Sequence, residues 1–257
     1  MNDVAAGKLG KYIYCIIASD RPRSFGPLGI GAPGGELTTI CFQGIAAVVS
    51  NSPIIKYALS RDNMIAHEKA IEEVMKEFQV LPVRFCTIAE SEEKVAKILE
   101  KEHDRFAELL KTMDGKTELS VIAIFKEDVV YKDIADKFQD IRAFKEKSAG
   151  LPPEKTRGPL MEIGRRVEAA LRQEREIHKE EILQALKALT CDVKVNDNYG
   201  ELMILKAAFL VERRREEEFD RTVNELAEKY AGKIRFKYVG TLPPFNFVNL
   251  VIETGNY

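Results

Sequence analysis

Two related stretches decide the fold, LPVRFCT at residues 81–87 and LPPFNFV at residues 242–248. Each follows a charged segment with helical periodicity and leads from proline into an apolar, phenylalanine-containing run, so each is predicted to set a strand. The pair therefore predicts the same structural event in two separate halves of the chain. Neither stretch offers a catalytic nucleophile, a metal site or a phosphate-binding loop, which favours a binding or assembly protein over an enzyme.

The length and charge of the chain restrict its possible functions. At 257 residues the chain accommodates one large domain or two of roughly 100–150 residues. Its 39 basic and 41 acidic residues predict no nucleic-acid partner, because phosphate binding needs a clustered cationic surface. No segment approaches the ~20 apolar residues that span a bilayer, and residues 1–4 do not begin a signal peptide. We therefore expect a cytoplasmic protein without a membrane partner.

The first half of the chain is predicted to form a sheet covered by helices. Residues 12–18 are continuously apolar, which is typical of a central strand covered on both faces. The apolar runs 37–42 and 45–50 flank Gln43 and Gly44 and predict a hairpin. Ser60 is the expected N-cap of an amphipathic helix. The elements predicted after this helix are a strand at 80–87, a helix at 91–113 and a strand at 118–125.

The second half begins after a change in composition. Residues 128–158 combine a short charged helical piece with glycine and proline, and we expect a linker there. Residues 160–189 predict one helix of about 30 residues, or ~45 Å. The elements predicted after this helix are strands at 191–195 and 202–211, a helix at 214–230, and strands at 234–239 and 245–252.

Both halves together predict an α+β fold of two ferredoxin-like domains, with mixed or antiparallel sheets and helices on one face. The N-terminal, modified ferredoxin-like domain is predicted at 1–127 and the linker at 128–158. The C-terminal ferredoxin-like domain, with its long leading helix, is predicted at 159–257.

No residue pattern predicts catalysis or cofactor binding. His67, His103 and His178 lie in different predicted helices without a second ligand at helical spacing, so we predict no metal site. The glycines within residues 26–35 lack the lysine and the helix that follow a phosphate loop. The four cysteines are far apart in apolar runs and are predicted to be buried and reduced. We therefore assign no catalytic, cofactor-binding or metal-binding residue.

A series of motifs follows one order along nearly the whole chain. They are YIYCII at 12–17, GIG at 29–31, GIAAVVS at 44–50, SR at 60–61, AHE at 66–68, LPVRF at 81–85 and GTLPPFNFV at 240–248. Together these motifs resemble the gas vesicle protein F/L family. That family usually carries glycine at the position of Cys86.

The resemblance implies a non-enzymatic accessory protein of gas vesicle formation, without a cofactor. It implies that the chain binds the small, hydrophobic gas vesicle shell protein and has other gas vesicle accessory proteins as partners, at the vesicle or its precursor in the cytoplasm. A shell subunit that hides its apolar face only after polymerising must be kept from aggregating. A partner with apolar grooves and sheet edges meets that need.

The candidate partner-binding residues are Arg84, Phe85, Pro243, Pro244 and Phe245. One interpretation is that these residues fix the strand starts and the core packing. The other is that they border a groove between the domains, which takes the shell protein. Arg84 is the best single candidate, because a charged residue within an apolar strand needs a partner or the edge of a cleft.

Two functions of other classes stay open at this point. Paired ferredoxin-like domains often bind small molecules at their interface, so a ligand-sensing regulatory module is the main alternative. The third hypothesis is an enzyme that uses the inter-domain cleft, which the histidines and cysteines hardly support.

Overall fold

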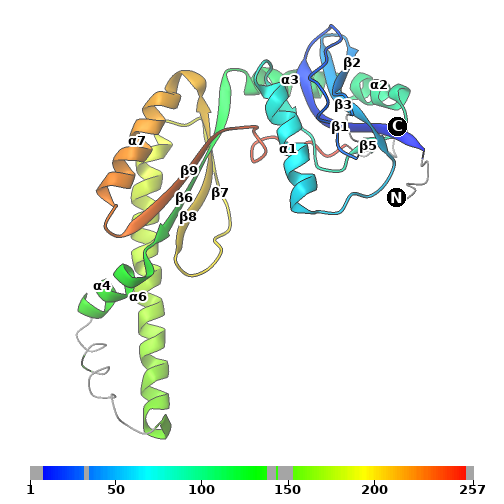
Figure 1. The fold of residues 1–257 in the computed structure, drawn as a ribbon. Helices are drawn as coiled ribbons and strands as arrows, with labels where there is room; N and C mark the ends of the chain where they lie inside the picture. The colour runs from blue at the N-terminus through cyan, green and yellow to red at the C-terminus, as the bar shows by residue number, and fades with distance from the viewer. Residues whose placement is uncertain (1–7, 32–34, 138–142, 144–152, 253–257) are drawn as a thin grey trace. The chain divides into compact units, whose positions relative to one another are not determined.

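The computed structural model describes residues 8–31, 35–137, 143 and 153–252. These residues form two compact units, each an antiparallel sheet with helices (Figure 1). The first unit comprises the chain up to Glu118 together with the residues from Thr241 onward, and the second comprises Leu119–Gly240. The predicted α+β fold class is thereby confirmed.

The first sheet is built around its most apolar strand. Its strand order is β2-β3-β1-β4, and β5 also pairs with β1. Every residue from Tyr12 to Ile17 in β1 is fully buried, so the prediction of a central, covered strand is confirmed. The strands are β1 (Leu9–Ala18), β2 (Thr38–Phe42), β3 (Ile45–Pro53), β4 (Val80–Pro82) and β5 (Ile88–Ala89).

The predicted hairpin joins β2 to β3. Phe42 pairs with Ile45, and the two residues between them have positive φ angles, 44° at Gln43 and 87° at Gly44. Two successive residues with positive φ give a turn whose twist matches that of the flanking strands. Asparagine or glycine is more usual than glutamine at the first of these positions, but the glycine at the second was sufficient to identify the turn.

The described residues of the first unit also form three helices, α1 (Arg61–Met75), α2 (Glu92–Lys101) and α3 (His103–Met113). The Ser60 side chain accepts a hydrogen bond from the backbone N–H of Asn63, which confirms the predicted N-cap. The single helix predicted at 91–113 is divided at Glu102, where φ is −99° and ψ is 8°. Because of this break, α2 packs against β2 while α3 contacts β1 and β4.

The second sheet has the strand order β7-β8-β6-β9. Figure 1 shows α6 and α7 along one face of this sheet, and their apolar residues share one core with β6 and β8. The long helix is confirmed, although it begins earlier than predicted. The elements are β6 (Lys116–Phe125), α4 (Glu127–Lys137), α6 (Pro153–Lys187), β7 (Asp192–Val195), β8 (Met203–Glu212), a short 3-10 turn η1 (Arg213–Arg215), α7 (Glu216–Lys229) and β9 (Ile234–Leu242).

Glu174 interrupts the apolar face of α6 and takes part in a network of ion pairs. The Glu174 carboxylate is largely buried and accepts hydrogen bonds from Lys137 of α4 and, at 2.8 Å, from Lys233. Lys233 also lies 3.2 Å from the Asp133 carboxylate. Buried charges require such partners, and these contacts hold Glu174 ionised by lowering its pKa against the effect of burial.

The predicted domain limits of 1–127, 128–158 and 159–257 differ from these units. The strand β6, predicted within the N-terminal domain, lies between β8 and β9. Residues 128–137, predicted as linker, belong to α4, whose Val130 and Ile134 are buried in the second core. Residues 138–142 and 144–152 of the predicted linker lie outside the described residues.

The segment between β1 and β2 is held by tyrosine hydroxyl groups. The backbone N–H of Ile30 donates to the Tyr14 hydroxyl oxygen at 2.7 Å, and this hydroxyl lies 2.9 Å from Ser50 Oγ. Gly31 has a φ of 83°, and a Cβ atom there would lie 1.7 Å from the Tyr57 hydroxyl. Position 31 therefore requires glycine both for its backbone conformation and for the close approach of Tyr57.

Alanine substitutions at two glycines, Gly26 and Gly31, test the effect of the close approach of Tyr57. Gly26 has a φ of 85° but no atom within 4 Å of an added Cβ, so Gly26→Ala isolates the backbone strain. We expect Gly26→Ala to lower the free energy of unfolding by about 1 kcal/mol. Gly31→Ala should cost about 1–3 kcal/mol more, because Tyr57 must also move. Urea unfolding followed by circular dichroism measures both, and equal losses would contradict the proposed role of Tyr57.

Candidate functional site

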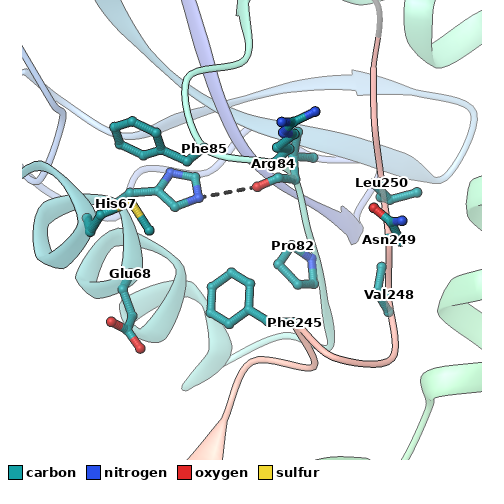
Figure 2. A pocket seen from close by; sticks show the side chains of 11 residues that line it. His67, Glu68, Pro82, Arg84, Phe85, Phe245, Val248, Asn249 and Leu250 are labelled. Atoms are coloured by element: carbon teal, nitrogen blue, oxygen red, sulfur yellow. Dashed lines mark hydrogen bonds between the residues drawn. The ribbon is translucent and has the colours of Figure 1, made fainter. Parts of the chain in front are cut away.

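A hollow of about 400 Å³ lies on the first unit, where three segments meet (Figure 2). The helix α1 contributes Met64, His67 and Glu68. The chain that follows β4 contributes residues 82–85, and the segment after β9 contributes Phe245 and residues 248–250. Figure 2 shows His67 and Glu68 on one side and residues 248–250 on the other, with Pro82 between them.

A second hollow of about 610 Å³ shares Arg84 and Phe85 with the first. Its other lining residues are mainly apolar and come from the segment after β3, from the start of β5 and from residues 251–252. We call the two hollows together the Arg84–Phe85 surface. The residues that line the second hollow are Ile54, Ile55, Lys56, Tyr57, Leu59, Arg84, Phe85, Cys86, Thr87, Ile88, Val251 and Ile252.

The strand predicted at 80–87 is wrong beyond Pro82. The residues after β4 turn away, and the Thr87 hydroxyl donates to the Arg84 carbonyl oxygen at 2.7 Å. Cys86 has a φ of 64°, in the left-handed region that favours glycine, and the glycine usual in the resembling family fits this conformation. Arg84 and Cys86 thus lie on a turn rather than on one face of a strand. The turn exposes the Arg84 side chain at the border of both hollows.

Buried hydrogen bonds of Tyr12 and His67 fix the backbone of this turn. The backbone N–H of Cys86 donates to the Tyr12 hydroxyl oxygen at 2.8 Å, and this hydroxyl lies 3.1 Å from His67 Nδ1. His67 Nε2 lies 3.2 Å from the Val83 carbonyl oxygen, which can only accept, so Nε2 carries the proton. Burial lowers the pKa of His67 to about 4, so the imidazole is neutral at pH 7 and Nδ1 accepts from the Tyr12 hydroxyl.

The segment from Pro243 onward forms a turn, whereas a strand was predicted at 245–252. The backbone N–H groups of Phe247 and Val248 both donate to the Pro244 carbonyl oxygen, at 3.1 and 2.9 Å. Proline fixes the backbone φ here and cannot donate a ladder hydrogen bond, which favours the turn. Farther along, the Arg84 N–H donates to the Leu250 carbonyl oxygen at 3.2 Å, so this segment runs beside the residues after β4.

The turn is anchored by a buried carboxylate at the start of β6. Glu118 accepts hydrogen bonds from the backbone N–H of Asn246 at 2.8 Å and from its side-chain amide at 2.6 Å. Burial raises the pKa of Glu118, and the two Asn246 donors oppose that shift. Glu118 was not predicted from the sequence, although a carboxylate within an apolar strand needs a partner for the same reason as a charged arginine does.

The structure brings together three of the five candidate partner-binding residues. Arg84, Phe85 and Phe245 line the first hollow, with Phe245 39% exposed. Pro243 and Pro244 are buried and line neither hollow, so their structural role is to place Phe245. Arg84 is exposed, and within the described part of the chain its guanidinium has no ion-pair or hydrogen-bond partner.

Other chemistry is sparse in the part of the chain that the structure describes. That part contains no cluster of three histidine, cysteine, aspartate or glutamate side chains arranged to hold a metal ion. Among its helices none has both the length and the apolar composition needed to cross a membrane. The cysteines are unpaired, but the prediction that all are buried is wrong: Cys15 is buried, Cys41 and Cys86 are half-buried, and Cys191 is exposed.

Comparisons with known proteins give one consistent result. The family model described as "Gas vesicle synthesis protein GvpL/GvpF" matches residues 10–249. The "Gas vesicle protein F" of a Streptomyces species is 28% identical over 93% of this chain and 100% of its own length, and that of a Nostoc species is 26% identical over 94% and 98%. The crystal structure of GvpF from an Anabaena species superposes with a TM-score of 0.79 at 26% identity, covering 95% of this chain and 99% of that one.

The neutral state of His67 predicts a pH-dependent stability. Its pKa is about 4 in the folded chain, against 6.5 for an ordinary histidine, so the unfolded chain binds the extra proton between these values. The contribution to the free energy of unfolding is complete above pH 6.5 and falls by up to about 3 kcal/mol as the pH drops to 4. His67→Gln, which does not titrate, should show a flatter pH dependence in urea unfolding.

His103 provides the contrasting control. It lies at the surface, and its pKa is raised by the hydrogen bond to Asp104 and by that to the Gln43 carbonyl oxygen. A raised pKa stabilises the fold at low pH and loses its effect as the pH rises, so His103→Gln should change the profile with the opposite sign. Identical profiles for the wild type and His67→Gln would contradict the neutral assignment.

The Glu118–Asn246 contact predicts how firmly the turn is held. Asn246→Ala removes the amide donor to a buried carboxylate and should lower the free energy of unfolding of the first unit by about 1.5–3 kcal/mol. Cleavage within residues 241–252 during limited proteolysis should also accelerate. Asn249→Ala, an exposed asparagine of the same segment, is the matched control and should change neither quantity. If both variants are cleaved at the wild-type rate, the contact does not anchor the turn.

Proposed function

Because the chain belongs to the gas vesicle synthesis protein GvpL/GvpF family, we propose that this accessory protein binds the small, hydrophobic gas vesicle shell protein and aids nucleation or assembly of the vesicle. The family supports this role over a ligand-sensing module or an enzyme. The proposed partners are the shell protein and other gas vesicle accessory proteins. The proposed location is the cytoplasm, at the vesicle or its precursor.

The observation that carries this proposal is the apolar character of the Arg84–Phe85 surface. Large apolar side chains are exposed in both hollows: Met64 and Phe245 in the first, and Ile55, Leu59 and Val251 in the second. Leu59 is 81% exposed. Contiguous exposed apolar residues mark interaction sites, because their exposure to water costs free energy that a partner can recover.

The surface suits a partner that is itself apolar. A shell subunit with an exposed apolar face aggregates unless another protein covers that face. Phe85, half-buried between the two hollows, and Phe245 offer aromatic contact area of the kind that dominates binding at interfaces. The buried contacts of Tyr12, His67 and Glu118 hold the surrounding backbone before a partner arrives, which lowers the entropic cost of binding.

We also propose that each unit is a variant of the ferredoxin-like fold. When the strands of each unit are numbered along the chain, their order across both sheets is second, third, first, fourth; β5 of the first unit lies off this path. The second unit has helices after its first and third strands, α4 and α6 and then α7. In the first unit the described residues between β1 and β2 form no helix, and the segment held by Tyr14 takes its place.

Co-expression with the shell protein tests the proposed function. The tagged wild-type chain should retain the shell protein during purification, and a strain lacking the chain should lose buoyancy. The double substitution Leu59→Ser and Phe245→Ser removes one exposed apolar side chain from each hollow and should reduce the retained shell protein at least about ten-fold.

Matched surface residues of the second unit serve as the control. Tyr199 and Val195 are 73% and 50% exposed, and the double substitution Tyr199→Ser and Val195→Ser should leave retention unchanged. If the deletion strain floats normally and the wild-type chain retains no shell protein, the proposed function is wrong.

A further inference from the structure

The charged side chains on the Arg84–Phe85 surface have a defined order. Glu68 lines the first hollow and Lys56 the second, whereas Arg84 lines both and therefore lies at their shared border. The other lining residues of the two hollows are apolar or uncharged, apart from the buried, neutral His67. Across the surface the charges thus run from negative at Glu68 to positive at Arg84 and Lys56.

These three charges are available to a partner. Within the described residues, none of the three side chains forms an ion pair or a hydrogen bond in the structure. Glu68 is partly buried, and this burial together with the nearby Glu72 raises the pKa of Glu68. A cation brought next to Glu68 would offset both effects.

An apolar segment covering both hollows would remove Arg84 from water. A cation covered by apolar groups must be paired with an anion, or binding is strongly weakened. A protein that bound any apolar segment without selection would gain nothing from an unpaired arginine at the centre of its binding surface. The charges therefore select among apolar segments, and their order selects the direction in which a segment lies.

We propose that the Arg84–Phe85 surface binds an amphipathic segment of the shell protein in one direction. Apolar side chains fill both hollows, a basic side chain lies at Glu68, and an acidic side chain lies at Arg84 and Lys56. This inference rests on the proposed function and specifies the chemistry of the segment that the shell protein presents.

Overlapping peptides that cover the shell protein sequence test this inference directly. Each labelled peptide is titrated with the full chain, and the dissociation constant is read from fluorescence anisotropy. The bound peptides should carry a basic and an acidic residue on opposite sides of at least two apolar residues. A peptide of the same composition with the two charges exchanged should bind at least ten-fold more weakly.

Charge reversal on the protein supplies the second arm. Arg84→Glu should weaken the best peptide at least ten-fold, and replacing the acidic residue of that peptide by lysine should restore binding to Arg84→Glu. Arg84→Gln removes the charge alone and should give an intermediate loss. Arg21→Glu is the control, because Arg21 is an exposed arginine of the first unit that lines neither hollow. Thermal unfolding verifies that each variant is folded.

The outcomes separate this inference from the proposed function. If the shell protein is retained by the wild-type chain but peptide binding is indifferent to Arg84→Glu and to charge exchange, the directional inference is wrong and the proposed function stands. Weaker binding of the charge-exchanged peptide to the wild-type chain, together with restored binding of the lysine-substituted peptide to Arg84→Glu, supports the direction. If neither the shell protein nor any of its peptides binds, both proposals fail.

Discussion

The Arg84–Phe85 surface depends on the buried contact between Tyr12 and His67. Tyr12 belongs to the central strand of the first sheet, His67 to α1, and the turn at residues 83–87 is bound by both. The Tyr12 hydroxyl accepts from the Cys86 N–H and donates to His67 Nδ1, and His67 Nε2–H donates to the Val83 carbonyl oxygen, with the ring kept neutral by its burial. Loss of the Tyr12 hydroxyl would remove the hydrogen bond to the Cys86 N–H, and loss of the His67 ring would remove the bond to the Val83 carbonyl oxygen, so either change weakens the turn that holds Cys86 at a φ of 64°.

Local signals in the sequence identified most elements, and distant contacts explain the errors. The covered strand β1, the hairpin at Gln43–Gly44 and the cap at Ser60 depend on neighbouring residues, and each was predicted. The segments 83–87 and 245–252 look like strands by composition. Their turns are held by Tyr12 and His67 in one case and by Glu118 in the other, which lie far away in the sequence.

The candidate site was predicted in part, although the premise for Arg84 was wrong. A charge within an apolar strand needs a partner, and this argument led to Arg84, but the residue lies exposed on a turn, at the border of two hollows. The same argument applied to Glu118 would have led to the contact that anchors Phe245. Apolar contributors such as Leu59 and Val251 carry no comparable signal, because exposed and buried leucine or valine look alike in a sequence.

The path of the chain also determines when this surface can exist. The first unit includes residues from Thr241 onward, which follow the whole second unit in the sequence. During synthesis the second unit therefore emerges completely before Phe245, Val248 and Leu250 can join α1 and the turn at Arg84. A chain that lacks residues 245–250 lacks one wall of the first hollow, so the Arg84–Phe85 surface is complete only after the second unit has been synthesised.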